Sequence, residues 1–270
     1  MIMIKRVAFT SRMSVFFKRI LDFALRGVGF ELRRISADPA PRFDASVEET
    51  IAKVWNTDIT RTLTMTSPER LNAMIKAVEY IEANKIEGDI VECGVWRGGS
   101  MMASALTLQR LGSFSRYLYL FDTFDGMPPP TDADTDKFGQ TAASLLATEE
   151  RESSAVWAVA NLECVKSNLA TLDYPQNFIH FIEGTVETTI PNRAPESIAI
   201  LRLDTDWYES TRHELEHLYP RLVEGGVLII DDYGHWQGAR KAVDEYIATN
   251  NIRIYLHWID YTGRIAIKVS

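Results

Sequence analysis

Apolar positions recur along this chain in two rhythms, one typical of strands and one typical of helices. Short apolar runs predict five strands, namely Asp89–Cys93, Tyr117–Phe121, Phe178–Glu183, Ile198–Leu203 and Val227–Ile230. Helical spacing between them predicts helices at about Ser100–Leu111 and Ala155–Leu169, one ending at Leu218, and one at Ala239–Ala248. Two further strands, Ile254–Trp258 and Arg264–Val269, predict a closing hairpin across Asp260–Gly263. The alternation predicts an α/β fold with a doubly wound, mostly parallel, seven-stranded, Rossmann-like sheet covered on both faces.

Another helix is predicted to begin near Thr66. The run Thr66-Ser67-Pro68-Glu69 offers capping side chains, a proline suited to a first helical turn, and a glutamate three places after the threonine. The apolar stripe of this helix follows at helical spacing, formed by Leu71, Met74, Ile75, Val78 and Ile81.

Residues 1–45 form a separate, basic N-terminal extension and linker, so that the main domain is predicted to be 46–270. Residues 11–26 predict an amphipathic helix, and the proline-containing stretch Ala37–Ala45 predicts a linker. The helix could bind a membrane surface peripherally, with basic residues meeting anionic head groups. Alternatively, it packs on the domain or on a second subunit, and we expect a homo-oligomer.

Charge and composition narrow the function classes. With eight basic and two acidic residues, 1–34 carries about +6 by count, and the net charge of −8 leaves about −14 for the rest. A chain with a pI near 5.2 is not expected to bind nucleic acid. Two cysteines, no membrane-length apolar run and no clear signal peptide predict a cytoplasmic protein.

Ligands of doubly wound sheets bind beyond the carboxyl ends of the strands, so the residues at those ends are the candidate site. The first strand is followed by the glycine-rich turn Gly94–Ser100, where the backbone can approach a ligand closely. This turn does not spell G-x-G-x-x-G, which weakens a dinucleotide interpretation. A tight strand–helix turn without a ligand is the alternative.

Asp122 follows the next predicted strand, and an acidic side chain there can accept both hydroxyls of a ribose. A turn or capping aspartate is the alternative. Gly184 follows a further strand and would let an aromatic ring such as adenine lie against the backbone, although a plain turn glycine is equally compatible. The intervening segment Asp125–Glu152 is predicted to be a surface loop and a candidate lid.

Four carboxylates are predicted to meet at one edge of the sheet. Asp204 and Asp206 follow one strand, and Asp231 and Asp232 follow the next. A divalent cation relieves the repulsion between such groups, and an all-oxygen set favours magnesium, manganese or calcium over zinc. Solvated strand-end acids are the alternative.

The histidines add little metal chemistry. His213, Glu214 and His217 spell H-E-x-x-H, but no further ligand cluster accompanies them, so we interpret both histidines as packing or surface residues. His235 follows the paired aspartates and could contact substrate. No G-x-S-x-G elbow is present, which argues against an α/β-hydrolase.

Taken in order, six segments resemble the macrocin O-methyltransferase (TylF-type) family of S-adenosylmethionine-dependent sugar O-methyltransferases. They are MTSPERL (65–71), VECGVWRGGS (91–100), FDTFDGMPPP (121–130), FIEGTVETT (181–189), LRLDTDWYEST (201–211) and GGVLIIDDYG (225–234). The resemblance implies a class I methyltransferase fold.

The resemblance also implies roles for residues. The methionine part of the cofactor would be lined by Glu92, Gly94 and Ser100. The ribose would be held by Asp122, with Thr123 and Phe124 beside it, and the adenine would be bordered by Gly184 and Thr185. A lid over the cofactor would include Met65 and Thr66. Asp204, Asp231 and Asp232 would bind Mg²⁺, and Asp206 would be the general base. Catechol-type relatives use a lysine near this strand end, whereas here Trp207, Tyr208 and Glu209 follow Asp206.

The sequence therefore predicts a methyltransferase that moves the methyl group of S-adenosylmethionine to a hydroxyl on a small-molecule or glycan acceptor. The competing hypotheses are an NAD(P)-dependent oxidoreductase on a related fold and a non-catalytic binding module. The missing phosphate-binding fingerprint weakens the first alternative, and the strand-end carboxylates weaken the second.

Overall fold

The computed structural model describes residues 5–9, 30–34 and 42–269, which fall into two compact units, 1–45 and 46–270. In the first unit, strand β1 (Lys5–Phe9) pairs in parallel with β2 (Phe30–Arg34). The helix predicted at 11–26 and most of the linker predicted at Ala37–Ala45 lie outside the described residues.

A seven-stranded sheet forms the centre of the second unit, in the order β5-β4-β3-β6-β7-β9-β8. The first five of these strands are parallel to one another, and β9 runs antiparallel to both β7 and β8. The strands span Asp89–Cys93 (β3), Leu118–Asp122 (β4), Ile179–Glu183 (β5), Ile198–Leu203 (β6), Leu222–Ile230 (β7), His257–Trp258 (β8) and Arg264–Ile267 (β9). The predicted fold class is confirmed.

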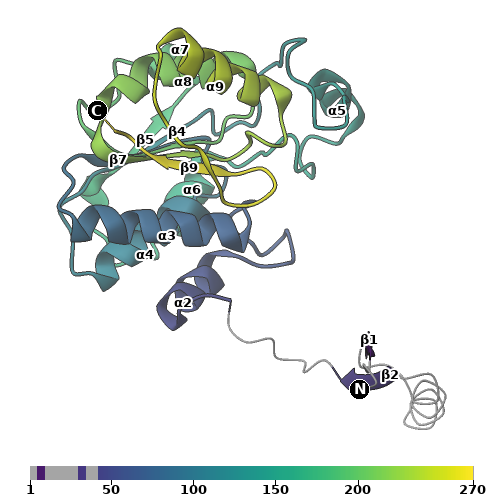
Figure 1. The fold of residues 1–270 in the computed structure, drawn as a ribbon. Coiled ribbons are helices and arrows are strands. Elements are labelled where there is room, and N and C mark those ends of the chain that lie inside the picture. Colours follow the sequence, from purple (N-terminus) through teal and green to yellow (C-terminus); the bar gives the residue numbers. More distant parts are fainter. Residues whose placement is uncertain (1–4, 10–29, 35–41, 270) are drawn as a thin grey trace. The chain divides into compact units, whose positions relative to one another are not determined.

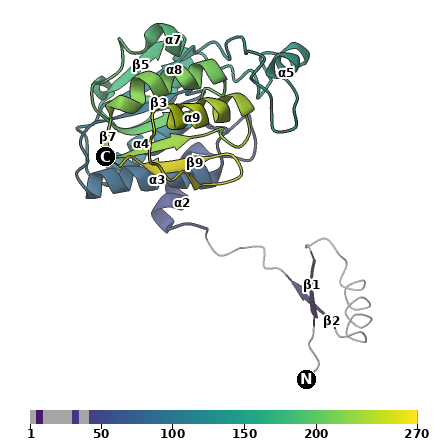
Figure 2. The same cartoon turned by 45° about the horizontal axis from the view of Figure 1, so that its top comes forward.

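Helices cover both faces of this sheet, as Figures 1 and 2 show from two directions. One face carries α3 (Pro68–Ala83), α4 (Gly99–Arg110) and α6 (Leu162–Leu169), and the other carries α7 (Val186–Thr189), α8 (Tyr208–Leu218) and α9 (Gln237–Thr249). The remaining helices are α2 (Ala45–Val54), α5 (Ala142–Thr148) and the short 3₁₀ turns Gln176–Phe178 and Tyr219–Arg221. Within the described residues, no helix combines the length and the apolar character needed to cross a membrane.

Apolar side chains explain why the strands lie at the centre. All six residues of β6 are buried, as are the last five of β7, because helices cover both of their faces. Helix α3 begins as predicted, with Pro68 in its first turn and the Ser67 hydroxyl accepting a hydrogen bond from the backbone N–H of Arg70. The buried apolar runs therefore explain the strands, and the cap explains where α3 begins.

Four predicted segments differ from the structure. Strand β7 begins earlier than the predicted Val227–Ile230, and β8 covers only the last two residues of the predicted Ile254–Trp258. The helix expected at Ala155–Leu169 begins only at Leu162, where Asn161 caps it by accepting from the N–H of Cys164. The segment expected to be a loop, Asp125–Glu152, contains helix α5, whose buried Ala142 and Leu146 belong to an apolar cluster with two tryptophans of the main unit, Trp207 and Trp236. Its short apolar stripe lies among turn-forming residues, so that helical spacing was hard to recognise.

Candidate active site

A pocket of about 360 Å³ opens at the carboxyl ends of β3, β4, β6 and β7. Its volume lies within the range of small-molecule sites, roughly 300–1,000 Å³. The strand order reverses between β3 and β6, and in open α/β sheets ligands bind at such a reversal. Predicted residues that line the pocket are Met65, Thr66, Gly94, Asp122, Thr123, Gly184, Thr185, Asp204, Asp206, Asp231 and Asp232.

The turn after β3 needs a glycine at Gly94. Its φ is +82°, and a Cβ atom there would lie 2.1 Å from the carbonyl oxygen of Asp204. Only a residue without a side chain lets the ends of β3 and β6 approach this closely. The turn therefore brings the backbone at Val95 and Trp96 to the floor of the pocket, both of which line it.

Asp122 holds this turn in place. One carboxylate oxygen accepts from the backbone N–H groups of Val95 (2.6 Å) and Trp96 (3.1 Å), and the other accepts from Phe124 (2.7 Å). Burial raises the pKa of Asp122, although these hydrogen bonds work in the opposite direction. The residue predicted to hold a ribose thus lines the pocket and also organises the glycine-rich turn.

Three of the residues expected to line the cofactor are buried and are not among the residues that line this pocket, namely Glu92, Ser100 and Phe124. Glu92 is paired with Arg202, at 2.5 Å, while its other oxygen has no hydrogen-bond partner in the described structure. Burial raises the pKa of Glu92 to about 7, against the opposing effect of Arg202. The burial of these side chains depends on how strand, helix and turn pack, which motif position does not reveal.

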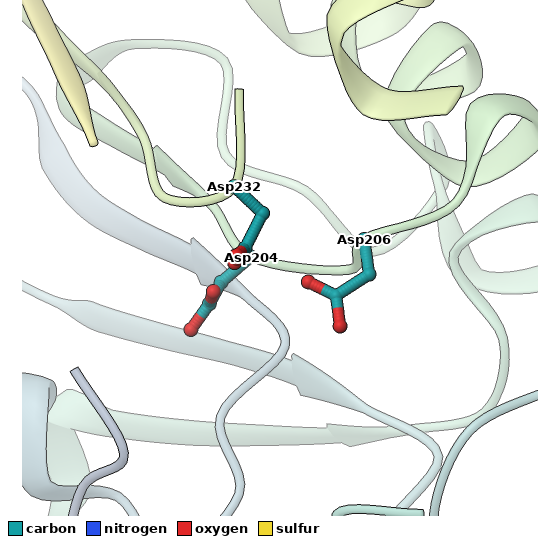
Figure 3. Close-up of side chains that lie close together, drawn as sticks. All are labelled: Asp204, Asp206 and Asp232. Carbon is teal, nitrogen blue, oxygen red and sulfur yellow. The ribbon is translucent and has the colours of Figure 1, made fainter. Parts of the chain in front are cut away.

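Three aspartates converge at the strand ends. Carboxylate oxygens of Asp204, Asp206 and Asp232 all lie within 4.8 Å of one another, and Figure 3 shows the carboxyl group of Asp206 facing the other two. Asp206 has a φ of +68°, which a non-glycine residue adopts infrequently. This conformation turns the chain out of the strand and brings the Asp206 side chain back toward the cluster. We call these three residues the acid cluster.

The acid cluster concentrates negative charge. Burial is the first cause that raises the pKa values of Asp204 and Asp206 well above the ordinary range, and the neighbouring aspartates add to it. Asp204 keeps a quarter of its side chain exposed, and it faces the pocket. Such an arrangement of oxygen ligands suits a hard divalent cation, which would relieve the repulsion.

Asp231 does not join the cluster, although it was predicted as a cation ligand. Its two carboxylate oxygens pair with the guanidinium groups of Arg202 and Arg70, and the hydroxyl of Thr66 donates to it at 3.2 Å. The two arginines lower the pKa of Asp231 despite its burial. Asp206, predicted as the general base, takes the third place in the cluster.

Arg202, which pairs with residues around the site, is a buried arginine that sequence reasoning missed. Its side chain is 3 % exposed, and it contacts Glu92 at 2.5 Å and Asp204 at 2.7 Å in addition to Asp231. Its signal in the sequence is a single arginine inside the apolar strand Ile198–Leu203, since a buried charge needs partners. Arg70 was likewise missed, and it links Asp231 to Asp260 at 3.1 Å.

The H-E-x-x-H residues form no metal site with one another. His213 contacts the carbonyl oxygen of Ile190 through Nε2 at 3.1 Å, and its ring packs on that of His217. Glu214 is fully buried, and it accepts from the hydroxyl of Thr205 at 2.9 Å. The prediction that these histidines are packing residues agrees with their contacts.

Comparison with known proteins identifies the family. The family model described as macrocin-O-methyltransferase (TylF) matches residues 35–267. Over 200 residues, the chain is 34% identical to a demethyldecarbamoylnovobiocin O-methyltransferase from Streptomyces niveus and 36% identical to a rhamnosyl-tetracenomycin-C 4'-O-methyltransferase from Streptomyces olivaceus. Each match covers 74% of this chain and 73% of the relative.

Solved structures agree with this match. The O-methyltransferase NovP superposes with a TM-score of 0.69 at 29% identity, covering 94% of this chain and 99% of that one. The calicheamicin methyltransferase CalS11 has a TM-score of 0.56 at 17% identity, covering 86% of this chain and 94% of that one, and it supports the fold alone. The chain therefore belongs to the macrocin O-methyltransferase (TylF) family, whose members transfer the methyl group of S-adenosylmethionine to a hydroxyl group.

Proposed function

We propose that this enzyme methylates a sugar hydroxyl of a glycosylated small molecule, with a divalent cation, most simply Mg²⁺, in the acid cluster. The observation that carries the proposal is the convergence of Asp204, Asp206 and Asp232 beside the pocket. The relatives support the acceptor class, because one of them is described as acting on a rhamnosyl group and another as a mycinamicin III 3''-O-methyltransferase.

The cofactor would occupy the part of the pocket between β3, β4 and β5. Gly94 brings the backbone close to the ligand, Asp122 offers a carboxylate for the ribose, and Gly184 and Thr185 border the adenine end. S-adenosylmethionine supplies an electrophilic sulfonium methyl, so the remaining requirement is a deprotonated acceptor oxygen.

The residues fit a cation on chemical grounds. Three carboxylates offer hard oxygen ligands, and Mg²⁺ keeps open positions for water or substrate oxygens when proteins supply few ligands. We propose Asp204 and Asp232 as its ligands, with Asp206 at its side, because Arg70 and Arg202 occupy the oxygens of Asp231. When bound, such an ion lowers the pKa of a coordinated hydroxyl.

Asp206 would act as the general base. It lines the pocket, and its carboxyl group lies beside Asp204 and Asp232, where an acceptor hydroxyl held by the cation would meet it. The chain therefore contributes one group that accepts the proton and two that hold the cation.

An activity screen with glycosides, read by mass spectrometry for the gain of one methyl group, tests the function. We expect transfer that EDTA abolishes and added Mg²⁺ restores. The variant Asp206→Asn should lose about 10²–10⁴-fold in rate while it still binds S-adenosylmethionine. Asp125→Asn is the matched control, since Asp125 is 79% exposed and pairs with Arg151 on the surface. Wild-type turnover by Asp206→Asn would contradict the base assignment.

Calorimetric titration with Mg²⁺ alone tests the ligand set. Asp232→Asn should weaken binding of the ion, whereas Asp231→Asn should mainly lower the stability of the fold through its unpaired arginines. Loss of Mg²⁺ binding in Asp231→Asn, with Asp232→Asn unaffected, would instead support the ligand set that includes Asp231. Ultraviolet crosslinking measures whether the chain retains labelled S-adenosylmethionine, and a parallel experiment measures its response to NAD(P)H. Retention of the first without a response to the second supports methyl transfer over oxidoreductase chemistry.

A further inference from the structure

Two exposed aromatic residues that are far apart in sequence are both approached by one lysine, and one of them lines the pocket. The side chain of Phe138 is 83% exposed and that of Tyr261 is 54% exposed. The ammonium group of Lys137 lies 4.0 Å from the centre of the Tyr261 ring and 5.1 Å from the centre of the Phe138 ring. We call Lys137, Phe138 and Tyr261 the aromatic rim.

The backbone holds the aromatic rim in a defined shape. A carboxylate oxygen of Asp136 accepts from the N–H groups of Phe138 and Gln140, both at 2.8 Å, which fixes the turn that carries Phe138. The same aspartate forms an isolated β-bridge with Trp236. Asp260 accepts from the backbone of the opposite turn, at Gly263 (2.7 Å) and Thr262 (3.0 Å). Exposed aromatic rings on fixed turns are suited to contact a ligand rather than to fill a core.

The aromatic rim continues into the reaction site. Tyr261 lines the same pocket as Asp206 and Asp232. His235 also lines it, its ring centre lies 6.3 Å from that of Tyr261, and its buried Nδ1 has no hydrogen-bond partner in the described structure. A buried polar atom without a partner is costly, and a polar group of a bound ligand would satisfy it. An acceptor whose hydroxyl reaches the acid cluster can therefore also contact His235 and Tyr261, which line the same pocket.

We propose that the aromatic rim is an acceptor subsite that binds a flat, apolar ring system carrying an acidic group, attached to the sugar that is methylated. This inference rests on the proposed function. Phe138 and Tyr261 stack on the ring system and lose water-exposed apolar area, and the ammonium group of Lys137 attracts the acidic group. His235 hydrogen-bonds a sugar oxygen nearer the cluster.

The probe for this subsite is 1-anilinonaphthalene-8-sulfonate, a planar apolar ring system with one negative charge. Its fluorescence is titrated against the full chain with saturating S-adenosylhomocysteine, which fills the cofactor part of the pocket. Phe138→Ser and Tyr261→Ser should each weaken binding about fivefold or more, and Lys137→Gln about threefold. Phe114→Ser is the matched control. Phe114 is 43% exposed and lies between α4 and β4, before the amino end of β4, whereas the pocket opens at the carboxyl ends of the strands.

Unchanged binding in both rim variants would overturn the proposal, and so would equal weakening by Phe114→Ser, which indicates adsorption without a site. Unchanged binding in Lys137→Gln would overturn the proposal that the ligand carries an acidic group. A parallel assay compares methylation of 4-carboxyphenyl α-L-rhamnoside and methyl α-L-rhamnoside. Phe138→Ser should raise KM for the first and leave the second unchanged. If neither glycoside is methylated, the result counts against methylation of rhamnosides by this enzyme. The fluorescence titration still tests the aromatic rim independently.

Discussion

Replacing Arg202 by methionine should destabilise the domain strongly. The guanidinium group is 3% exposed and neutralises Glu92, Asp204 and Asp231, which are 1, 25 and 4% exposed. Methionine fills much of the volume but leaves these carboxylates without their shared partner. Removing one partner from a buried ion pair costs about 3–5 kcal/mol. With a urea dependence of about 3 kcal/mol per M, the unfolding midpoint should fall by roughly 1–2 M.

Equilibrium unfolding in urea, followed by tryptophan fluorescence and circular dichroism, measures this change. Arg212→Met is the matched control, because Arg212 is 41% exposed and pairs with Glu209 and Glu216 along one helix face. It should cost no more than about 1 kcal/mol. If Arg202→Met does not fold, Arg202→Lys should show an intermediate loss. A midpoint for Arg202→Met within the range of the surface control would refute the reasoning about the buried charges.

Three smaller changes test other contacts. Burial raises the pKa of Glu214 well above that of an unfolded chain. As pH rises between pH 5 and pH 8, the unfolded chain ionises this acid while the folded chain keeps it protonated, so stability falls, and Glu214→Gln should gain in unfolding free energy relative to wild type over this range. A methyl group in Gly94→Ala would collide with the Asp204 carbonyl, so this variant should lose S-adenosylmethionine binding in calorimetry at least about tenfold. Asp134 is fully buried and accepts a hydrogen bond from the backbone N–H of Tyr208 at 2.7 Å. Asp134→Ala should therefore lower the free energy of unfolding in urea by about 1–2 kcal/mol. A smaller loss would mean that water replaces the carboxylate.

The central strands were predictable because they are short apolar runs buried on both faces, whereas β8 covers only two exposed residues of the predicted Ile254–Trp258. Ile198–Leu203 and Asp89–Cys93 match the prediction at both ends. The start of α6 was not predictable, because apolar residues at 155–158 carry helical spacing but form turns that contact other segments. The N–H of Met127 donates to the carbonyl of Trp157, which draws that stretch toward the pocket.

The candidate site was predictable as a set of strand-end acids but not as a set of partners. The sequence places Asp231 and Asp232 next to each other, and strand geometry sends neighbouring side chains to opposite sides. Which of them faces a cation depends on where Arg70 and Arg202 lie, and those two arginines come from a helix and a strand far from Asp231 in the chain.

The amino-acid sequence alone determined the order of strands and helices, the edge of the sheet where acids gather, and the family resemblance. These properties follow from local burial patterns and from motifs whose residues are neighbours in the chain. The tertiary structure decided that Asp206 joins Asp204 and Asp232, that Asp231 pairs with two arginines, and that Lys137 approaches both Phe138 and Tyr261. Such contacts depend on distances between segments that are remote in sequence, and electrostatic and stacking energies fall steeply with distance.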